Sequence, residues 1–287
     1  MMKWFKKRKE IDQVALGINE RNLKLVYPLN PRKYFHLADD KVLTKAILEE
    51  QKVSVAEQFM VIESVGDITE KWAATPRKSC VIKPSKGSGG GGILIVDYDE
   101  ENGWTKGGKP ISEDTIERHI ANIIFGVFSF GADDKVLIEE KIIQHKTVTN
   151  LCHLGIADVR VIVKEGEIVM AMLRLPTKSS DGKANLHQGA VGVGVDIETG
   201  ILKKVFDLQS YAEIHPDSGQ QITGVQLPDW PKVLDTCLKV DAAFPLNYLG
   251  IDIAFDQHKG PMVLEINVRP GLEIQNVNQD GLRRTII

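Results

Sequence analysis

The sequence predicts an α+β protein in which antiparallel strand pairs alternate with amphipathic helices. Three stretches carry this prediction: a glycine-rich hairpin over residues 80–96, an alternating hairpin over 157–175 and a third hairpin over 248–268. Each contains two runs rich in β-branched residues, joined by a glycine-rich or polar connection, which is the pattern of antiparallel pairing. Amphipathic helices are expected between the hairpins, at 112–127 and 229–243.

Composition places the chain among globular proteins. Of its 287 residues, 43% are hydrophobic and 26% charged, enough for a substantial core in one large domain or two lobes. The formal net charge of -3 argues against a nucleic-acid binder, whose phosphate-contacting surface is normally basic. Cys80, Cys152 and Cys237 form no CxxC pair, which disfavours disulfides and structural zinc and favours a reducing, cytoplasmic setting.

The sequence does not predict a membrane protein. No apolar run approaches the roughly 20 residues of a membrane span, and the basic start at residues 1–9 has no apolar signal segment behind it. That basic N-terminus offers a weak contact to an anionic membrane surface, although a solvated terminus is the simpler interpretation. Residues 10–36 show little periodicity and are interpreted as a short helix or an extended arm.

The stretch CVIKPSKGSGGGGILIV at residues 80–96 holds more glycine than a turn requires. Without Cβ atoms, the backbone at Gly87 and at residues 89–92 can approach a ligand closely, and its successive N–H groups suit a phosphate. A Walker A loop or a dinucleotide-binding motif would be followed by a helix, whereas a strand follows here. We interpret the stretch as a flap over a nucleotide, with Lys83 as a phosphate contact; the alternative is a flexible surface hairpin.

The helix expected after residue 40 carries a cation where an anion would be favoured. Asp39 and Asp40 precede an amphipathic segment that runs to about residue 51 and are expected to cap it. Lys41 falls in the first turn, where the helix dipole disfavours positive charge. A bound phosphate would relieve this mismatch, and an ordinary exposed lysine is an equally good interpretation.

Further elements are expected between this helix and residue 143. A strand within 53–65 and a short helical segment at 72–74 precede the flap. Ser112 is expected to cap the next helix, whose apolar face consists of Ile116, Ile120, Ile123, Ile124 and Val127. The run KVLIEEKII at 135–143 is a buried strand with a charged end. In a nucleotide site that end would offer backbone groups to adenine and a carboxylate to ribose. Judged from this stretch alone, a solvated strand end is the favoured interpretation.

The hairpin over 157–175 has polar residues on one face. A two-residue turn would place Arg160 and Arg174 on opposite faces, so their convergence on one ligand requires a β-bulge or another register. Residues 178–194 are expected to form a polar, glycine-rich loop. Asp229 is expected to cap the helix that follows, and Pro231 to open it.

The hairpin over 248–268 predicts a metal site. Its connection at 257–260 sets a register that places Asp252 opposite Glu265, with Asn267 on the same face. Two facing carboxylates in a partly buried site require neutralisation. Together with an amide oxygen they are hard ligands that suit Mg²⁺ shared with substrate phosphates. The alternatives are a bridge from Arg269 or one protonated carboxylate.

The chain resembles the ATP-grasp superfamily, and within it the RimK-type α-L-glutamate ligases and glutamate ligase-like proteins, through six segments: ADDKVLTK, VIKPSKGSGGGG, VLIEEKI, ADVRVIV, ANLHQGA and GIDIAFDQHKGPMVLEINVRPGLE. The resemblance covers about residues 38–275. It implies the ATP-grasp fold, with two α+β lobes whose antiparallel sheets clasp ATP. The expected bounds are an N-terminal arm at 1–37, in place of a full preceding domain, and an ATP-grasp domain at 38–287. Within that domain, 38–142 would bind ATP and 143–287 would hold metal and substrate.

The resemblance also implies roles for individual residues. The nucleotide would contact Lys41, Lys83, Ser88, Gly89, Gly90, Glu140, Lys141, Asp158, Lys183 and Asn185. The metal ion, Mg²⁺ or Mn²⁺ in its place, would be held by Asp252, Glu265 and Asn267. The carboxylate being activated would face Arg160 and Arg174. Two departures from the RimK-like pattern are a longer segment at 144–156 and a lysine, Lys183, where arginine is expected.

The activity implied is ATP-dependent ligation of a carboxylate to an amine through an acyl phosphate, with glutamate or another amino acid as a candidate substrate. Small-molecule or peptide acids and amines would be the partners, and we expect a homo-oligomer. Two other functions stay open: a phosphotransferase on the same fold, and a non-catalytic nucleotide-binding partner of a cell-envelope or glycan assembly system.

Overall fold

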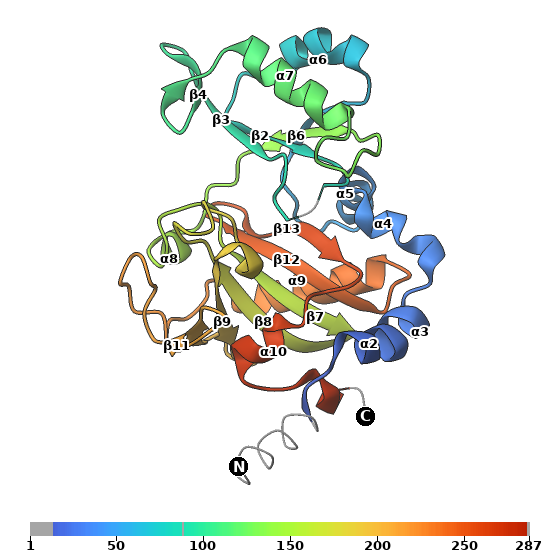
Figure 1. Ribbon diagram of the computed structural model, residues 1–287, viewed down its shortest axis with the longest axis vertical. Helices are drawn as coiled ribbons and strands as arrows, with labels where there is room; N and C mark the ends of the chain where they lie inside the picture. Colours follow the sequence, from blue (N-terminus) through green and yellow to red (C-terminus); the bar gives the residue numbers. More distant parts are fainter. Residues whose placement is uncertain (1–13, 88, 286–287) are drawn as a thin grey trace. The chain divides into compact units, whose positions relative to one another are not determined.

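The computed structural model describes residues 14–87 and 89–285, which divide into two compact units (Figure 1). The six-stranded unit comprises residues 39–46 and 55–142, and the seven-stranded unit comprises 14–38, 47–54 and 143–285. All strand pairings within both sheets are antiparallel in the described chain. The predicted α+β class with antiparallel sheets is therefore confirmed.

The six-stranded unit places two helices on one face of its sheet. In order across the sheet the strands are β1 (Gln58–Ile62), β6 (Val136–Glu140), β2 (Cys80–Pro84), β3 (Leu94–Asp99), β4 (Gly103–Lys106) and β5 (Lys109–Pro110). The helices are α6 (Ile68–Ala74), preceded by the short turn η3 (Val65–Asp67), and α7 (Glu113–Ile124). The predicted pairing on either side of the glycine-rich stretch is present, with Ile82 opposite Leu94.

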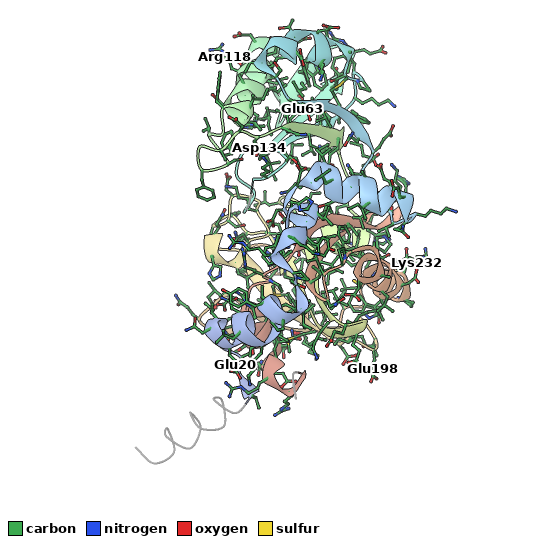
Figure 2. All side chains as sticks on the ribbon, turned by 90° about the vertical axis from the view of Figure 1, so that its right-hand side faces the viewer. Glu20, Glu63, Arg118, Asp134, Glu198 and Lys232 are labelled. Atoms are coloured by element: carbon green, nitrogen blue, oxygen red, sulfur yellow. The ribbon has the colours of Figure 1, made fainter. Side chains whose placement is uncertain are left out.

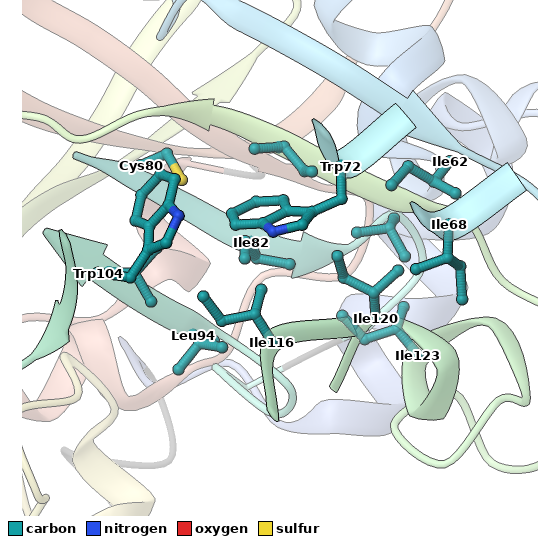
Figure 3. Close-up of a cluster of buried hydrophobic side chains, with 13 residues drawn as sticks. Ile62, Ile68, Trp72, Cys80, Ile82, Leu94, Trp104, Ile116, Ile120 and Ile123 are labelled. Carbon is teal, nitrogen blue, oxygen red and sulfur yellow. The ribbon is translucent and has the colours of Figure 1, made fainter. Parts of the chain in front are cut away.

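The core of this unit lies between the helices and the sheet (Figure 3). The rings of Trp72 and Trp104 lie 4.9 Å apart between centroids. Ser112 caps α7 as predicted, since its Oγ accepts the Thr115 N–H at 3.2 Å. Val127 does not belong to the apolar helix face, which corrects the prediction, because α7 ends at Ile124 and the chain turns through Gly126 at φ +73°. Val127 is 62% exposed.

Helix α5 (Lys41–Glu50) begins where the sequence predicts. Asp40 Oδ1 accepts the N–H groups of Val42 at 3.0 Å and Leu43 at 3.3 Å, which satisfies two donors of the first turn. The segment before it is helical rather than extended. It contains α2 (Ile18–Arg21), η1 (Asn22–Val26), α3 (Tyr27–Leu29), η2 (Arg32–Tyr34) and α4 (His36–Asp39).

The seven-stranded unit has a long central sheet with a helix on each face. Its strands in order are β11 (Tyr211–Ala212), β10 (Leu202–Phe206), β9 (Val191–Val195), β8 (Glu167–Leu175), β7 (Asp158–Lys164), β12 (Tyr248–Asp256) and β13 (Gly260–Asn267). In Figure 1, α9 (Trp230–Ala243) lies behind this sheet and α10 (Glu273–Asn278) in front. Short helical turns complete the unit: α8 (Lys146–Thr149), η4 (Leu186–Gln188) and η5 (Leu282–Thr285).

Two local predictions in this unit are wrong. The loop expected at 178–194 ends earlier, because VGVGV forms β9; its glycines are needed where α10 packs closely, since a Cβ at Gly192 would lie 2.5 Å from Val277 Cγ2. Asp229 precedes α9 but its side chain makes no cap hydrogen bond. Its carboxylate lies 3.3 Å from Lys232 Nζ instead.

Residues near the N-terminus of the described chain brace the end of the β12–β13 hairpin. Asn30 Nδ2 donates to the carbonyls of Tyr248 at 2.7 Å and Val268 at 3.1 Å, and Asn30 Oδ1 accepts the Tyr248 N–H at 3.0 Å. Arg21 Nη1 donates to the Pro270 carbonyl at 2.7 Å. These buried contacts give a structural role to the part of residues 10–36 that the structure describes, for which the sequence indicates no chemical role.

The surface of the unit carries further ion pairs. Glu20, labelled in Figure 2, pairs with Arg283 and so ties α2 to η5. Among the described helices, none combines the length and the hydrophobicity needed to cross a membrane. The basic residues 1–9, which suggest a weak membrane contact, lie outside the described residues.

Candidate active site

Four charged side chains on one face of the seven-stranded sheet form an ion-pair network, called here the sheet network: Asp158, Arg160, Arg174 and Asp252. Arg160 donates from Nε to Asp252 Oδ1 at 2.7 Å and from Nη2 to Oδ2 at 2.6 Å. Arg174 bridges both carboxylates, donating to Asp252 Oδ2 at 2.7 Å and to Asp158 Oδ1 at 2.6 Å. The network therefore balances two guanidinium groups against two carboxylates.

Strand register brings these side chains together. A β-bulge in β8, opposite Ile162 and Val163, shifts the β7–β8 pairing, so that Asp158 lies opposite Arg174. Arg160 in turn lies opposite Asp252 on β12. Because side chains of directly paired residues share a face, both arginines point to the same side of the sheet. The two arginines therefore converge through a bulge, as the sequence predicts.

The environment shifts the two aspartates in opposite directions. Burial raises the pKa of the Asp158 carboxyl to about 6, although the Arg174 guanidinium opposes the shift. Burial alone would also raise the pKa of Asp252, but Arg160 and Arg174 hold it below its ordinary value. Each carboxylate has a guanidinium partner, and that partner favours the ionised form of the carboxylate.

The predicted metal ligands share one hairpin. Asp252 lies opposite Glu265, as predicted, but the register arises from a shorter turn, with Asp256 paired to Gly260, and a bulge after Asp252. Asn267 Nδ2 lies 3.3 Å from Asp252 Oδ2 and donates to it. The ribbon thus presents two carboxylates and an amide on one face.

Neither predicted alternative for neutralising this pair holds at Asp252. Arg160 and Arg174 compensate its charge, whereas the guanidinium carbon of Arg269 lies 4.8 Å from the ring centroid of Phe35. Asp252 is therefore not bridged by Arg269, whereas a bridge to Glu265 stays a prediction. The Arg269 side chain makes a cation–π contact with the segment near the N-terminus.

The donor chemistry of the ribbon suits a hard divalent ion such as Mg²⁺. Among the described residues no group of three His, Cys, Asp or Glu side chains is placed to hold a metal ion, so phosphate oxygens and water would have to complete its coordination. A metal ion at Asp252 would share that carboxylate with two arginines, which leaves Glu265 and Asn267 as the remaining protein ligands.

The six-stranded unit holds a second charged cluster, called here the lysine triad: Lys45, Lys83 and Glu139. Lys83 Nζ pairs with Glu139 Oε1, and Lys45 Nζ lies 2.6 Å from Glu139 Oε2. The side chains are 11%, 7% and 6% exposed for Lys83, Lys45 and Glu139. Burial alone would raise the pKa of Glu139, but the two lysines hold it below its ordinary value.

The sequence pattern points to Lys83 but not to Lys45 or Glu139. Two signals were available. Lys45 lies four residues after Lys41 and so shares a face of α5 with it. Lys83 pairs with Leu137 in the sheet, and Glu139 is two residues further along β6 and therefore on the same face.

The glycine-rich loop between β2 and β3 takes backbone conformations that glycine allows. Gly89 and Gly90 have φ of +62° and +75°. Lys41 Nζ donates to the Gly87 carbonyl at 2.7 Å, which brings the first turn of α5 to this loop. At the far end, His119 Nε2 donates to the Gly92 carbonyl at 2.8 Å. Ser88, a predicted nucleotide contact, lies outside the described residues.

The remaining predicted nucleotide contacts make local interactions. Glu140 Oε1 accepts the Glu57 N–H at 2.8 Å, and Lys141 Nζ lies 2.7 Å from Asp97 Oδ1. In the seven-stranded unit, Asn185 Oδ1 accepts the His187 N–H at 3.1 Å. Lys183 donates its backbone N–H to the Ser180 carbonyl at 3.1 Å. Their assignment to a nucleotide pocket stays a prediction.

Comparison with known proteins adds family evidence to this geometry. Residues 20–286 match the profile of a family described as sugar-transfer associated ATP-grasp. A probable alpha-L-glutamate ligase from Azotobacter vinelandii is 23% identical over 248 residues, covering 86% of this chain and 61% of that protein. The chain therefore spans about three fifths of the length of this relative.

Two solved structures share the fold. Biotin carboxylase from Campylobacter jejuni has a TM-score of 0.56 at 13% identity, covering 88% of this chain and 46% of that chain. The D-cycloserine synthetase DcsG has a TM-score of 0.52 at 15% identity, covering 90% of this chain and 71% of that chain. At these identities the likeness concerns the fold alone.

Proposed function

Because this chain belongs to the sugar-transfer associated ATP-grasp family, we propose that it is an ATP-dependent ligase that joins a carboxylate to an amine. The observation that carries the proposal is the register of the β12–β13 ribbon, which sets Asp252 opposite Glu265 beside two arginines. Hard oxygen ligands next to guanidinium groups suit a reaction in which phosphate and carboxylate meet.

The six-stranded unit supplies groups for the nucleotide phosphates. Lys83 and Lys41 provide ammonium groups, and the left-handed backbone at Gly89 and Gly90 allows close approach of N–H groups to phosphate oxygens. Lys41 already contacts the loop through the Gly87 carbonyl. A phosphate bound there would meet both the loop and the first turn of α5.

The seven-stranded unit supplies groups for the reacting carboxylate. Arg160 and Arg174 each direct N–H groups at carboxylate oxygens in the sheet network, and these donors suit a substrate carboxylate and the oxyanion that develops from it. Glu265 and Asn267, with Asp252, would hold Mg²⁺, which supplies neutralisation of phosphate charge when bound. Asp158 positions Arg174 through their ion pair.

The proposed ligation has two steps. An oxygen of the substrate carboxylate attacks the γ-phosphorus of ATP, and the bond to the β-phosphate oxygen breaks to release ADP. The amine nitrogen then attacks the acyl carbon, inorganic phosphate leaves, and the nitrogen loses a proton to give the amide. The glycine-rich loop serves to exclude water, which would otherwise hydrolyse the acyl phosphate.

The family and one of its distant relatives suggest a substrate class. A sugar-transfer association suggests that the acid or the amine is carried by a sugar, and the similarity to a glutamate ligase suggests an amino acid as the other reactant. We therefore propose amino sugars and uronic acids, together with glutamate and other amino acids, as the first compounds to test.

The test measures ADP formation with pairs drawn from these acids and amines, in the presence of ATP and Mg²⁺. We expect ADP only when acid and amine are both present, and a loss of about 100-fold or more in Glu265→Gln. Glu198→Gln, an exposed carboxylate of the same unit that Figure 2 labels, should retain wild-type turnover. ATP binding without acid-dependent ADP across the panel contradicts the proposal, and a stable phosphorylated acceptor without amide supports a phosphotransferase.

A further inference from the structure

The lysine triad has an unequal count of charges. Lys45 and Lys83 carry two positive charges, and Glu139, whose pKa lies below its ordinary value, carries one negative charge at neutral pH. The three side chains come from α5, β2 and β6 of the six-stranded unit and are each at least 89% buried. The buried cluster therefore has a net charge of about +1, by the ordinary ionisation of these groups.

A pair of Lys83 and Glu139 alone would be neutral. The carboxylate of Glu139 would fix the position of the Lys83 ammonium group but would also offset its charge. A neutral pair attracts an anion weakly. Lys45 changes this balance because it takes the second carboxylate oxygen, Oε2, at 2.6 Å. Each oxygen of Glu139 then has its own cation, and the three side chains together carry one more positive charge than negative charge.

We propose that Glu139 is a positioning residue that fixes the ammonium group of Lys83, and that Lys45 offsets the charge of Glu139 so that the triad retains a positive charge for a nucleotide phosphate. This inference rests on the proposed function, because it takes Lys83 to contact ATP. Neither Glu139 nor Lys45 needs to touch the nucleotide. Both act through Lys83.

The energetics of buried charges and of lysine side chains favour this role over a purely structural one. Buried ion pairs add little net stability, because desolvation of the charges consumes most of the Coulomb gain, so a third buried charge has no obvious structural benefit. A lysine side chain is long and flexible, and a fixed one loses less entropy when a ligand binds. Fixing Lys83 on Glu139 therefore favours phosphate binding, provided that its charge is not cancelled.

The position of α5 is consistent with this role. Lys41 and Lys45 lie one turn apart on this helix, and Lys41 reaches the Gly87 carbonyl of the glycine-rich loop. The first turns of α5 thus deliver one ammonium group to the loop and another to the triad. Lys41 and Lys45 both lie in the same unit as Lys83.

Charge-changing variants of the full chain separate the two parts of the proposal. Lys45→Met leaves the triad neutral, and the double variant Lys45→Met/Glu139→Gln restores its net charge to that of the wild type. Affinity for Mg·ATP and Mg·ADP is measured by calorimetry at fixed ionic strength, and thermal unfolding is measured for each variant without nucleotide. Lys135→Met is the matched control, because Lys135 flanks β6 and pairs at the surface with Glu63, labelled in Figure 2.

We expect Lys45→Met to weaken ATP binding by about tenfold or more, which corresponds to roughly 1.4 kcal/mol. The double variant should recover to within about threefold of the wild type, the remainder reflecting the loss of the group that fixes Lys83. A merely structural role would not produce this recovery of affinity. The control variant should bind ATP as the wild type does.

The outcomes distinguish this inference from the function on which it rests. A wild-type protein that does not bind ATP overturns the proposed function, and the inference with it. If the wild type binds ATP but Lys45→Met binds it equally well, or the double variant binds no better than Lys45→Met, only the inference is overturned. If Lys45→Met does not fold, the double variant decides: affinity more than tenfold below that of the wild type contradicts the proposal.

Discussion

Removal of Arg174 should destabilise the seven-stranded unit more than removal of Arg160. Arg174 is the only one of the two that bridges both aspartates, with contacts of 2.6 Å to Asp158 and 2.7 Å to Asp252. In Arg174→Met, Asp158 keeps its burial and loses the guanidinium that offsets its charge. In Arg160→Met, by contrast, Asp252 retains Arg174, so neither aspartate loses every cationic partner in the network.

The magnitudes follow from this difference in remaining partners. Removing one member of a buried ion pair costs about 3–5 kcal/mol, because the other charge stays buried and uncompensated. Losing one charged hydrogen-bond partner while another remains costs about 1–3 kcal/mol. We therefore expect Arg174→Met to be less stable than Arg160→Met by roughly 2 kcal/mol, from the difference between these two ranges.

A double variant tests the mechanism as well as the magnitude. Asp158→Asn in the Arg174→Met background removes a carboxyl that must otherwise stay charged without its partner or take up a proton, and it should recover part of the lost stability, about 2 kcal/mol. The assay is hydrogen exchange of β7 and β12 amides at increasing urea concentrations, because two units can unfold in separate transitions. Equal destabilisation by the two arginine variants, or a double variant no more stable than Arg174→Met, would refute this account of the network.

Three further predictions concern other parts of the chain. Gly92→Ala should raise the KM for ATP, because a Cβ there would lie 2.6 Å from Phe128 Cγ and would displace the glycine-rich loop. The control is Gly103→Ala, which is also at positive φ but has open space around it; this variant should change stability and leave the KM for ATP unaltered. Asn30→Ala should lower the free energy of unfolding by about 2–3 kcal/mol, measured in urea, because it removes three buried hydrogen bonds; a loss below about 0.5 kcal/mol would contradict the bracing role. The pKa of Glu139 is lowered from 4.5, so its contribution to stability is present above pH 4.5 and is lost as the pH falls through the lower folded-state pKa. The difference in the free energy of unfolding between wild type and Glu139→Gln should therefore shrink on acidification below about pH 4.5. A difference that stays constant with pH would count against this prediction.

The sequence predicted the fold where hydrophobic periodicity and turn chemistry agree. The three hairpins and helix α7 follow from local patterns, because strand alternation and turn residues restrict pairing. The facing of Asp252 and Glu265 was also predicted, but the structure reaches it through a shorter turn and a bulge that the local pattern does not contain. Strand β9 was missed because Gly192 is in a strand for a tertiary reason, the close packing of α10. Local propensity carries no information about such a neighbour.

The charged partners of the site were harder to predict than its residues. Arg160 and Arg174 were expected beside a substrate, yet their partnership with Asp252 depends on a bulge in β8 and on pairing between strands distant in sequence. Glu139 and Lys45 meet across 94 residues of chain, and spacing alone does not join them. The nucleotide contacts, the metal ligands, the cytoplasmic location and a homo-oligomer stay predictions.

The most direct test of the central claim is trapping of an activated carboxylate with hydroxylamine in place of the amine. The account predicts that wild-type protein, ATP and Mg²⁺ convert an accepted acid to its hydroxamate with one ADP released per hydroxamate, and that Glu265→Gln forms neither. ADP release that does not depend on the acid, or an acid-dependent phosphorylated product that hydroxylamine does not capture, would contradict carboxylate activation as the function of this protein.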